Sequence, residues 1–352
     1  MDNRAVFVVD TGSRRTKAGL ATGHAPSVDF LSTVTPDGSV VGDEAAAVPD
    51  AVWPVHRGSV RSWEQVETLW RSAYAKAEVE SAGSVMLVAE QTLNTKAARE
   101  HTAQIMFESL DVHAGYICVA GQLALFAAGK TSGVVVESGA GVTTTVPIYD
   151  GFPRREGMQR IELAGEDATA AADAWLKRNA GSNYNGSLDV AREFKHAVAV
   201  VAPMGLDVSA EGAGEEASFE LPDGTAVTVP YVARALIGSS LFDGTSSMGS
   251  VQHAVAAGIE TVEPQMRDTL YATIVMSGGN ALTPGSCERL QAEVKQWAGQ
   301  RTAVAVSSPP DPVSAVWHGG VIVTTVGVFK KMCVTKIAYA ECGPNIIHRK
   351  CL

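Results

Sequence analysis

The sequence is poor in cysteine and in basic residues. Its five cysteines are odd in number and show no C-x-x-C spacing, so neither a disulfide framework nor a zinc ribbon is predicted. Lysine and arginine total 28 against 38 acidic residues, which gives a formal charge of -10. This balance argues against a non-specific binder of nucleic acid or of anionic membranes, since both need basic patches.

The sequence also lacks long apolar runs. No stretch approaches the length of a membrane span, and the start MDNRAVFVVD has neither the basic flank nor the long apolar core of a signal peptide. We therefore expect a soluble, intracellular protein.

What is present is the profile of a globular protein with two domains. Apolar residues make up 46% of the 352 residues and charged residues 19%. ATAAADAWLKRNA and NTKAAREHTAQIMFESL have helical spacing, whereas ASFELPDGTAVTV predicts a hairpin that turns at Pro222-Asp223-Gly224. Strands and helices that alternate in both halves indicate an α/β fold.

Three glycine-containing turns stand out. AVFVVDTGSRRTKAG and GVVVESGAGVTTT both run from an apolar strand through an acid to a glycine turn and back into a strand. In YATIVMSGGNALTPG a strand breaks at a glycine pair and leads into the helical pattern ERLQAEVKQW. Such turns let the backbone approach a ligand closely, so the two hairpins suggest a duplicated pair of phosphate-binding loops.

These three turns, in this order, resemble those of actin and the actin-related proteins. VVDTGSRRTKAG is similar to the first phosphate loop of actins, VVVESGAGVTTTVPIYDG to the second and IVMSGGNALTPG to the adenosine loop. TLNTKAAREHTAQIMFE, VGDEA, WPVHRGSVRSWEQVETLW, IELAGEDAT, ELPDG and the ending GPNIIHRKCL also lie where actins have counterparts. The collinear order of these stretches carries the resemblance from end to end of the chain.

The resemblance implies the actin-like ATPase fold shared with Hsp70 and sugar kinases, in which two similar α/β halves surround a nucleotide cleft. Residues 1–127 with 315–352 would form the first half, with a shortened subdomain at about 31–53. Residues 128–314 would form the second half, with a subdomain at about 164–246. The implied cofactors are ATP or ADP with Mg²⁺ (or Ca²⁺), and Asp10 and Glu137 would hold the metal through water.

The same resemblance assigns further residues to the nucleotide. Lys17 would add a charge-assisted contact to the phosphates. The remaining nucleotide-binding residues it implies are Thr11, Gly12, Ser13, Arg14, Ser138, Gly139, Ala140, Gly141, Val142, Arg192, Lys195, Gly278, Gly279 and Asn280.

Several positions depart from the actin pattern and weaken the expectation of catalysis. Arg14 replaces a glycine of the first loop, either as a new cation for the phosphate or as a solvated side chain. In the second loop Glu137 keeps a carboxylate, but Ala140 removes the second acid and Thr144 stands in place of a histidine that organises the attacking water. Gln122 matches the water-orienting glutamine only if a two-residue gap nearby does not shift it. We expect ATP hydrolysis to be slow or absent.

The adenine side has also changed. Thr283 and Val313 replace an aromatic residue and a lysine of actins, and His196 replaces a glutamate that contacts the ribose. These changes suggest weakened or remodelled nucleotide binding.

Two further differences concern assembly. Where actins carry a long loop that inserts into the next filament subunit, only TVTPDGSV remains, so self-polymerisation is not expected. The partner-binding groove of the family corresponds to Phe126, Thr131, Val326 and Met332. Phe329 beside them is interpreted as core, and Cys333 replaces a large residue.

The sequence therefore predicts a divergent actin-like structural subunit of a larger assembly, of the dynein/dynactin type or another cytoskeletal kind, in the cytoplasm, the cytoskeleton, or a cilium or flagellum. Direct contact with nucleic acid or membrane is not expected. One alternative is an active, filament-forming actin ATPase, and another is a nuclear actin-related subunit of a chromatin remodeller. A sugar-kinase or Hsp70-type enzyme is the remaining class that shares the fold.

Overall fold

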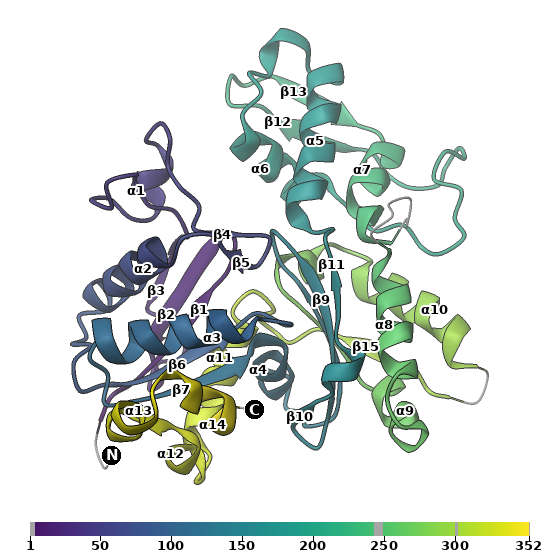
Figure 1. Ribbon diagram of the computed structural model, residues 1–352. Helices are drawn as coiled ribbons and strands as arrows, with labels where there is room; N and C mark the ends of the chain where they lie inside the picture. Colours follow the sequence, from purple (N-terminus) through teal and green to yellow (C-terminus); the bar gives the residue numbers. More distant parts are fainter. Residues whose placement is uncertain (1–3, 243–248, 300–301, 352) are drawn as a thin grey trace. The chain divides into compact units, whose positions relative to one another are not determined.

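The computed structural model describes residues 4–242, 249–299 and 302–351, which belong to two compact units (Figure 1). Unit 1 comprises Met1–Thr131, Asp150–Arg155 and Val313–Leu352, and unit 2 comprises Ser132–Tyr149 and Glu156–Pro312. The smaller subdomain expected at about 164–246 ends inside 243–248, which lies outside the described residues. No helix in the described part of the chain combines the length and the apolar character needed to cross a bilayer.

Unit 1 is built on a mixed sheet. Its strand order is β16-β7-β6-β1-β2-β3, with β1, β6 and β7 parallel and the other pairs antiparallel. The strands are β1 (Val6–Thr11), β2 (Arg15–Leu20), β3 (Val28–Leu31), β6 (Val85–Glu90), β7 (Ala114–Val119) and β16 (Val334–Thr335). The short strands β4 (Val55–His56) and β5 (Ser59–Val60) pair with each other, and β10 (Phe152–Pro153) also lies in this unit.

Helices surround this sheet. They are α1 (Asp43–Ala46), α2 (Trp63–Lys76), α3 (Lys96–Gln104), α4 (Ala120–Ala127), α11 (Ala315–Thr325), α12 (Phe329–Met332), α13 (Lys336–Cys342) and α14 (Ile347–Lys350). Hydroxyl side chains cap two of them: Ser62 accepts from the backbone N–H of Gln65 and Thr95 from that of Ala98. The helix predicted in NTKAAREHTAQIMFESL is confirmed as α3, and its last turn, Ile105–Ser109, is π-helical.

Successive side chains of β1 point to opposite faces of the sheet, and a helix packs on each face. The ring of Phe7 stacks on Tyr74 of α2, with ring centres 4.0 Å apart. The next residue, Val8, points the other way and meets Gly320 of α11, where an added Cβ would lie 2.6 Å from a methyl group of Val8. An added Cβ on Gly319 would lie 1.8 Å from the carbonyl oxygen of Leu123 in α4, so this glycine lets α11 and α4 pack closely.

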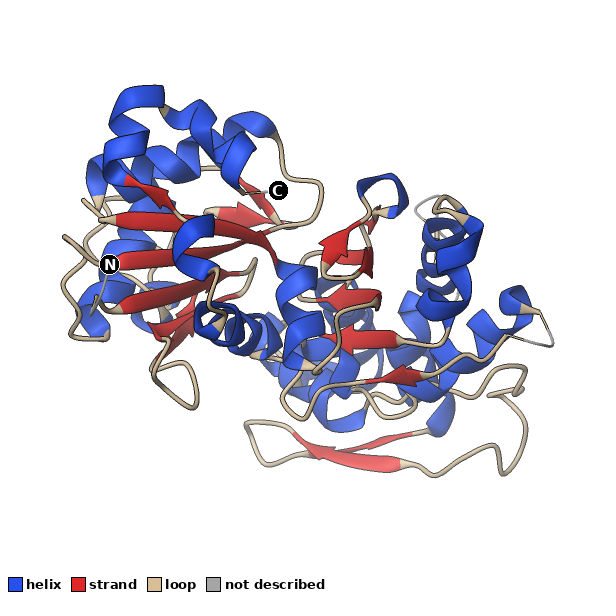
Figure 2. Cartoon of the chain, turned by 90° about the horizontal axis from the view of Figure 1, so that it is seen from below, coloured by secondary structure: helices blue, strands red, loops and turns tan. Residues whose placement is uncertain are grey.

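Unit 2 repeats the same arrangement with a second hairpin. Strand β8 (Gly133–Ser138) pairs antiparallel with β9 (Thr143–Tyr149) and parallel with β14 (Ile274–Ser277), as β1 pairs with β2 and β6 in unit 1. β15 (Val306–Ser307) and β11 (Gln159–Ile161) extend the sheet, and α8 (Val251–Glu260), α9 (Pro264–Tyr271) and α10 (Ser286–Ala298) pack against it. Figure 2 shows strands side by side with helices around them in each unit.

A smaller cluster completes unit 2. It contains α5 (Gly165–Asn179), α6 (Leu188–Val198), α7 (Tyr231–Gly238) and the hairpin of β12 (Ala217–Glu220) and β13 (Ala226–Val229). Phe194 lies at its centre, stacked on Trp175 and edge-on to Phe219. The turn predicted at Pro222-Asp223-Gly224 is confirmed by the bond from the N–H of Gly224 to the carbonyl of Leu221, 2.8 Å long.

Candidate functional site

The first glycine hairpin forms the tip of β1 and β2. Thr11 lies opposite Thr16, and the N–H of Gly12 donates to the carbonyl of Arg15 at 3.0 Å, which closes the turn over Gly12, Ser13 and Arg14. The hairpin predicted from AVFVVDTGSRRTKAG is therefore confirmed. Its tip presents backbone groups close together, as a phosphate-binding turn requires.

An acid and a lysine face each other just below this tip. Asp10 and Lys17 are directly opposite in the antiparallel register, so their side chains lie on the same face of the sheet. Lys17 is 7% exposed. Burial raises the pKa of the Asp10 carboxyl; the positive charge of Lys17 lowers it and Asp29 raises it further. The pair is a desolvated charge site from which contacts to a charged ligand would be strong.

Three contacts hold the tip against other parts of unit 1. The Ser13 hydroxyl accepts from the N–H of Gly58 at 2.8 Å, and the Thr11 hydroxyl accepts from the indole of Trp70 at 2.9 Å. The guanidinium of Arg14 lies over Trp53, 4.7 Å from the ring centre. Neither interpretation of Arg14 from the sequence included this cation–π contact.

The sequence does not link Trp53 and Gly58 to the first loop, because no residue of that loop indicates a contact with them. The stretch WPVHRGSV was noted only for its resemblance to actins. In the structure Trp53 and Gly58 of this stretch meet adjacent residues of the hairpin tip, Arg14 and Ser13.

The second glycine hairpin is built in the same way in unit 2. Glu137 lies opposite Thr144 and Ser138 opposite Thr143, while the N–H of Gly139 donates to the carbonyl of Val142 at 3.2 Å. Ala140 and Gly141 form the tip of the turn. This confirms the hairpin predicted from GVVVESGAGVTTT.

The start of α5 packs directly on this turn. The carbonyls of Gly139 and Ala140 accept from the N–H groups of Gly165 and Glu166 at 3.0 and 2.8 Å. The first donors of the helix are thereby satisfied by the turn itself. The ammonium of Lys195 on α6 donates to the carbonyl of Gly165 at 3.1 Å, which brings this predicted nucleotide residue to the same place.

The third glycine turn braces the second hairpin. The amide of Asn280 donates to the Ser138 hydroxyl and to the carbonyl of Gly139, both at 2.9 Å. The Ser138 hydroxyl is fully buried and also bonds to Thr143 at 2.8 Å. The Ser138 and Asn280 side chains thus stabilise the turn from inside. Their assignment to the nucleotide stays a prediction.

Gly278 is required for this close approach. Its φ of +88° lies in the left-handed region, and an added Cβ would be 2.3 Å from the carbonyl oxygen of Ser138. Its N–H donates to the carbonyl of Pro312 at 2.8 Å. The neighbouring Gly279 has open space around its Cα, so only the first glycine of the pair is fixed by packing.

The family model for actin matches residues 1–352. The chain belongs to the actin family. The actin-like α/β fold expected from the sequence is likewise confirmed. Family members generally bind a nucleotide with a divalent cation.

Gln122 has both ends of its amide engaged within unit 1. Its Nε2 donates to the carbonyl of Gly151 at 2.7 Å, and its Oε1 accepts from the Cys118 thiol at 3.2 Å. It lies in the first turn of α4. A glutamine held in this way has its orientation fixed by the protein.

The remaining predicted nucleotide residue, Arg192, pairs with Asp189 one helical turn earlier on α6. Its neighbour His196 has a lowered pKa because of burial and because of the charges of Lys195 and Arg192. His196 is thereby favoured in the neutral form beside two cations.

The donor chemistry of the two hairpins fits a hard divalent cation. Asp10 and Glu137 are each the second-last residue of a strand that leads into a glycine turn, and carboxylate oxygens suit Mg²⁺ and Ca²⁺. Over residues 4–242, 249–299 and 302–351, no three His, Cys, Asp or Glu side chains gather as a metal cage. A cation held by either carboxylate would take most of its ligands from water and phosphate, as Mg²⁺ commonly does.

The positions of the family's partner groove all lie in unit 1. Val326 is 49% exposed, Thr131 is exposed, and Phe126 and Met332 are half-buried. Phe329 is buried and meets Tyr116 edge-on, so its interpretation as a core residue is confirmed. Cys333 is buried as well.

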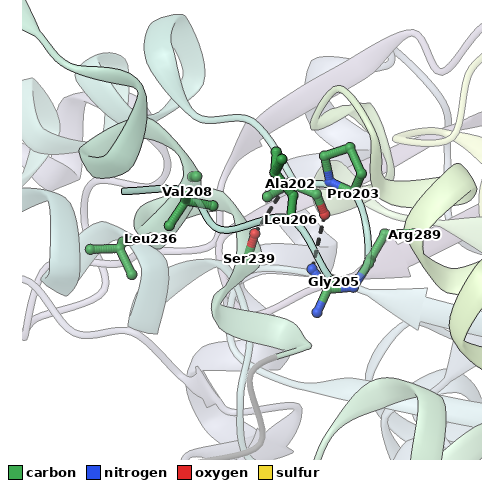
Figure 3. Close-up of a pocket in the computed structure, with 9 residues that line it drawn as sticks. Ala202, Pro203, Gly205, Leu206, Val208, Leu236, Ser239 and Arg289 are labelled. Carbon is green, nitrogen blue, oxygen red and sulfur yellow. Dashed lines mark hydrogen bonds between the residues drawn. The ribbon is translucent and has the colours of Figure 1, made fainter. Parts of the chain in front are cut away.

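A pocket of about 160 Å³ lies in unit 2 (Figure 3). Arg289 donates to the carbonyl of Ala202 at 2.9 Å on one side of it, and the N–H of Ala202 donates to Ser239 at 3.1 Å. Arg289 also pairs with Glu293. None of the nine lining residues belongs to the predicted nucleotide set, and leucines such as Leu206 and Leu236 line the pocket together with Ser239 and Arg289.

Proposed function

We propose that this actin-family chain binds ATP or ADP with Mg²⁺ (or Ca²⁺) and serves as a structural subunit of a larger assembly, with slow or absent hydrolysis. The observation that carries the proposal is the engagement of Gln122. Its amide is bonded on one side to Gly151 and on the other to Cys118. A water-orienting group must be aimed at the attacking water, whereas this amide is bonded to protein at both ends.

Nucleotide binding is supported by the two hairpins. Lys17 would neutralise phosphate charge from its buried position, and Asp10 and Glu137 would hold the cation through water. The bound cation would neutralise part of the negative charge of the phosphates. These interactions stabilise binding and require no chemical step.

Weak hydrolysis is further supported by the second hairpin. Ala140 at its tip has no polar side chain, and Thr144 is 1% exposed on β9. Catalysis of phosphoryl transfer is mostly positioning and electrostatics, so the loss of one acid and one imidazole removes much of what would organise water.

Poor self-assembly is supported by the compact turn that replaces the filament loop. The N–H of Thr35 donates to the carbonyl of Val40 at 3.0 Å. Asp37 accepts from Thr35 and from Ser39, and these bonds lower its pKa to about 2. A closed turn of this kind has no long segment that could reach a neighbouring subunit.

The assembly that we propose is cytoskeletal or motor-associated, of the dynein/dynactin type or a related kind, in the cytoplasm or a cilium. A nuclear chromatin remodeller is the alternative. Affinity purification from the native source, with identification of the stoichiometric partners, distinguishes these assemblies.

The first test is chromatography of the nucleotide released when the purified protein, never supplied with nucleotide, is denatured. One ATP per chain supports a locked structural subunit. One ADP per chain leads to a single-turnover assay, in which rapid phosphate release contradicts the proposal. An empty protein contradicts the binding role.

Self-assembly needs a separate measurement. Sedimentation under polymerising salt conditions, followed together with phosphate release, is expected to leave the protein in the supernatant. Pelleted filaments with coupled phosphate release would instead establish the active filament-forming ATPase.

A further inference from the structure

The hairpin of β12 and β13, labelled in Figure 1, is a sheet of two strands only. Among the described residues no other strand pairs with either of them, so each strand has one edge without a strand neighbour. Such an edge is a template onto which a further strand can be added, because its outward backbone groups can still form hydrogen bonds.

The register of the hairpin determines which backbone groups point outward. The N–H of Leu221 donates to the carbonyl of Thr225 at 2.9 Å, and from there hydrogen-bonded and non-hydrogen-bonded pairs alternate along an antiparallel ladder. The non-hydrogen-bonded pairs are Glu220 with Ala226 and Ser218 with Thr228. The N–H and C=O groups of Ala226 and Thr228 therefore point away from the hairpin, along the outer edge of β13.

The two faces of the hairpin differ in polarity. Phe219 and Val227 are half-buried on the face that packs on the smaller cluster, where Phe219 meets the ring of Phe194 edge-on. Glu220 and Ala226 lie opposite each other on the other face, and both are exposed. A strand added to β13 would extend both faces, so its side chains would meet apolar and acidic neighbours in alternation.

The sequence around the hairpin is acidic. Residues 197–233 contain six acids and neither lysine nor arginine. All six side chains are exposed: Asp207, Glu211, Glu215, Glu216, Glu220 and Asp223. Arg234, which follows this segment, donates to the carbonyls of Val198 and Glu215. The potential around the hairpin is therefore negative, and it favours a cationic partner.

We propose that an extended segment of a partner protein, with basic and apolar side chains in alternation, pairs with the outer edge of β13. Its backbone would bond to Ala226 and Thr228, and its apolar side chains would lie beside Val227. A lysine or arginine opposite Ala226 would reach across this small side chain toward Glu220, two strand spacings or about 10 Å away. The inference rests on the proposed function and deepens it, because it names the partner chemistry that a structural subunit would require.

The edge of β13 suits this occupant better than the alternatives. α6 packs against β12, whereas β13 has no comparable neighbour besides β12 in the described part of the chain. A second copy of the chain is disfavoured, since pairing of two β13 edges would bring two acidic segments together. The same charges repel a nucleic acid or an anionic bilayer.

The test uses the full chain and a fluorescent synthetic peptide of about ten residues, in which lysine and valine alternate. One control peptide has glutamate in place of lysine. A second has proline in place of valine, which keeps the charge and removes alternate backbone donors. Anisotropy titrations are expected to show that the lysine–valine peptide binds at least about tenfold more tightly than either control, with an affinity that falls as salt rises.

Two proline variants locate the edge. Thr228→Pro removes an outward N–H of β13 and leaves the hydrogen bonds to β12 in place, so peptide affinity is expected to fall about tenfold. Ser218→Pro makes the same change at the outer edge of β12 and is expected to leave affinity unchanged. Glu220→Gln is expected to weaken binding about threefold and to reduce its salt dependence. Glu263→Gln removes an exposed acid elsewhere in unit 2 and is the charge-matched control.

Hydrogen exchange of the unmodified protein tests the same point without any substitution. On peptide binding, the amides of residues 226–229 are expected to exchange more slowly, and those of residues 217–220 to change little. Protection of residues 217–220 alone would overturn the inference, whether or not the proline variants fold.

Equal binding of the three peptides, absence of binding, or an equal loss in Ser218→Pro and Thr228→Pro also overturns the inference. Dimers of the chain that Thr228→Pro abolishes would identify a second copy as the occupant and would overturn it as well. Nucleotide release from the same preparation is scored separately. A protein that holds ATP but ignores the lysine–valine peptide therefore refutes only the partner chemistry.

Discussion

The guanidinium of Arg14 lies over the ring of Trp53, 4.7 Å from its centre. These two residues are far apart in sequence, and the contact fastens the tip of the first hairpin to the segment that also supplies the N–H of Gly58 to Ser13. The stack gives the unusual arginine of this loop a structural role. Its role therefore differs from that of Lys17, the buried cation that we assign to the phosphates.

Replacement of Arg14 and of Lys17 should therefore have different effects. Arg14→Gln is expected to lower the free energy of unfolding by about 0.5–1 kcal/mol and to change nucleotide affinity less than about threefold. Lys17→Met is expected to lower nucleotide affinity about tenfold or more, because a charge-assisted contact is lost. Urea unfolding and titration with a fluorescent ATP analogue measure both. An equal loss of affinity in the two variants would show that Arg14 contacts the phosphates.

The adjacent glycines of the third turn offer a matched pair. Gly278→Ala places a Cβ 2.3 Å from the carbonyl of Ser138 at a φ of +88°, so we expect a loss of stability of about 1–3 kcal/mol and weaker nucleotide binding. Gly279→Ala has open space and is expected to behave as the wild type. Thermal unfolding and nucleotide content measure the contrast. Similar behaviour of both variants would mean that the turn shifts to accept the methyl group and keeps the hydrogen bonds of Asn280 to the second hairpin.

A buried ion pair anchors the C-terminal segment. Arg99 and Glu90 are 3.0 Å apart and each about 5% exposed, and Arg99 also donates to the carbonyl of Cys351 at 2.6 Å. Arg99→Met leaves the Glu90 carboxylate buried without its cation, and we expect a loss of about 3–5 kcal/mol. Burial raises the Glu90 pKa in the folded protein, so the loss should be smaller at acidic pH.

The controls for this pair are a double variant and a surface pair. E90Q/R99M removes the unpaired charge and is expected to recover part of the loss. Lys177→Met breaks an exposed pair with Asp173 and is expected to cost about 0.3–0.5 kcal/mol. Urea unfolding at pH 5 and pH 7 tests all three variants. A double variant that is no more stable than Arg99→Met would place the cost in the lost bond to Cys351.

Thiol reactivity should follow burial and pKa. Cys342 is exposed with a guanidinium 3.3 Å from its sulfur, whereas burial raises the pKa of Cys351 to about 11 and that of Cys333 to about 12. The thiolate is the reactive species, so at pH 8 a chromogenic disulfide reagent should label Cys342 first, then the half-buried Cys287. The three buried cysteines should react only after denaturation. Cys342→Ser should abolish the fast phase, and a fast phase that persists would contradict the assignment of Cys342 as the most reactive thiol.

Local signals in the sequence determined the hairpins and the family. An apolar run followed by an acid and a glycine turn folds back on itself through neighbouring residues, and the turn at Pro222-Asp223-Gly224 follows the same logic. The order of three such turns was enough for the resemblance. These features depend on contacts within a few residues, which a single sequence displays directly.

The tertiary structure alone decided what the side chains of those turns do. Asn280 meets Ser138 across 142 positions, and Arg99 meets the carbonyl of Cys351 across 252. Arg14 contacts the ring of Trp53, and neither interpretation of this arginine from the sequence included that contact. Such contacts depend on how sheets and helices pack over long sequence separations, and local pattern carries no information on that packing. The sequence therefore determined where the backbone turns, and the packing determined which polar groups remain for a ligand and which are used within the protein.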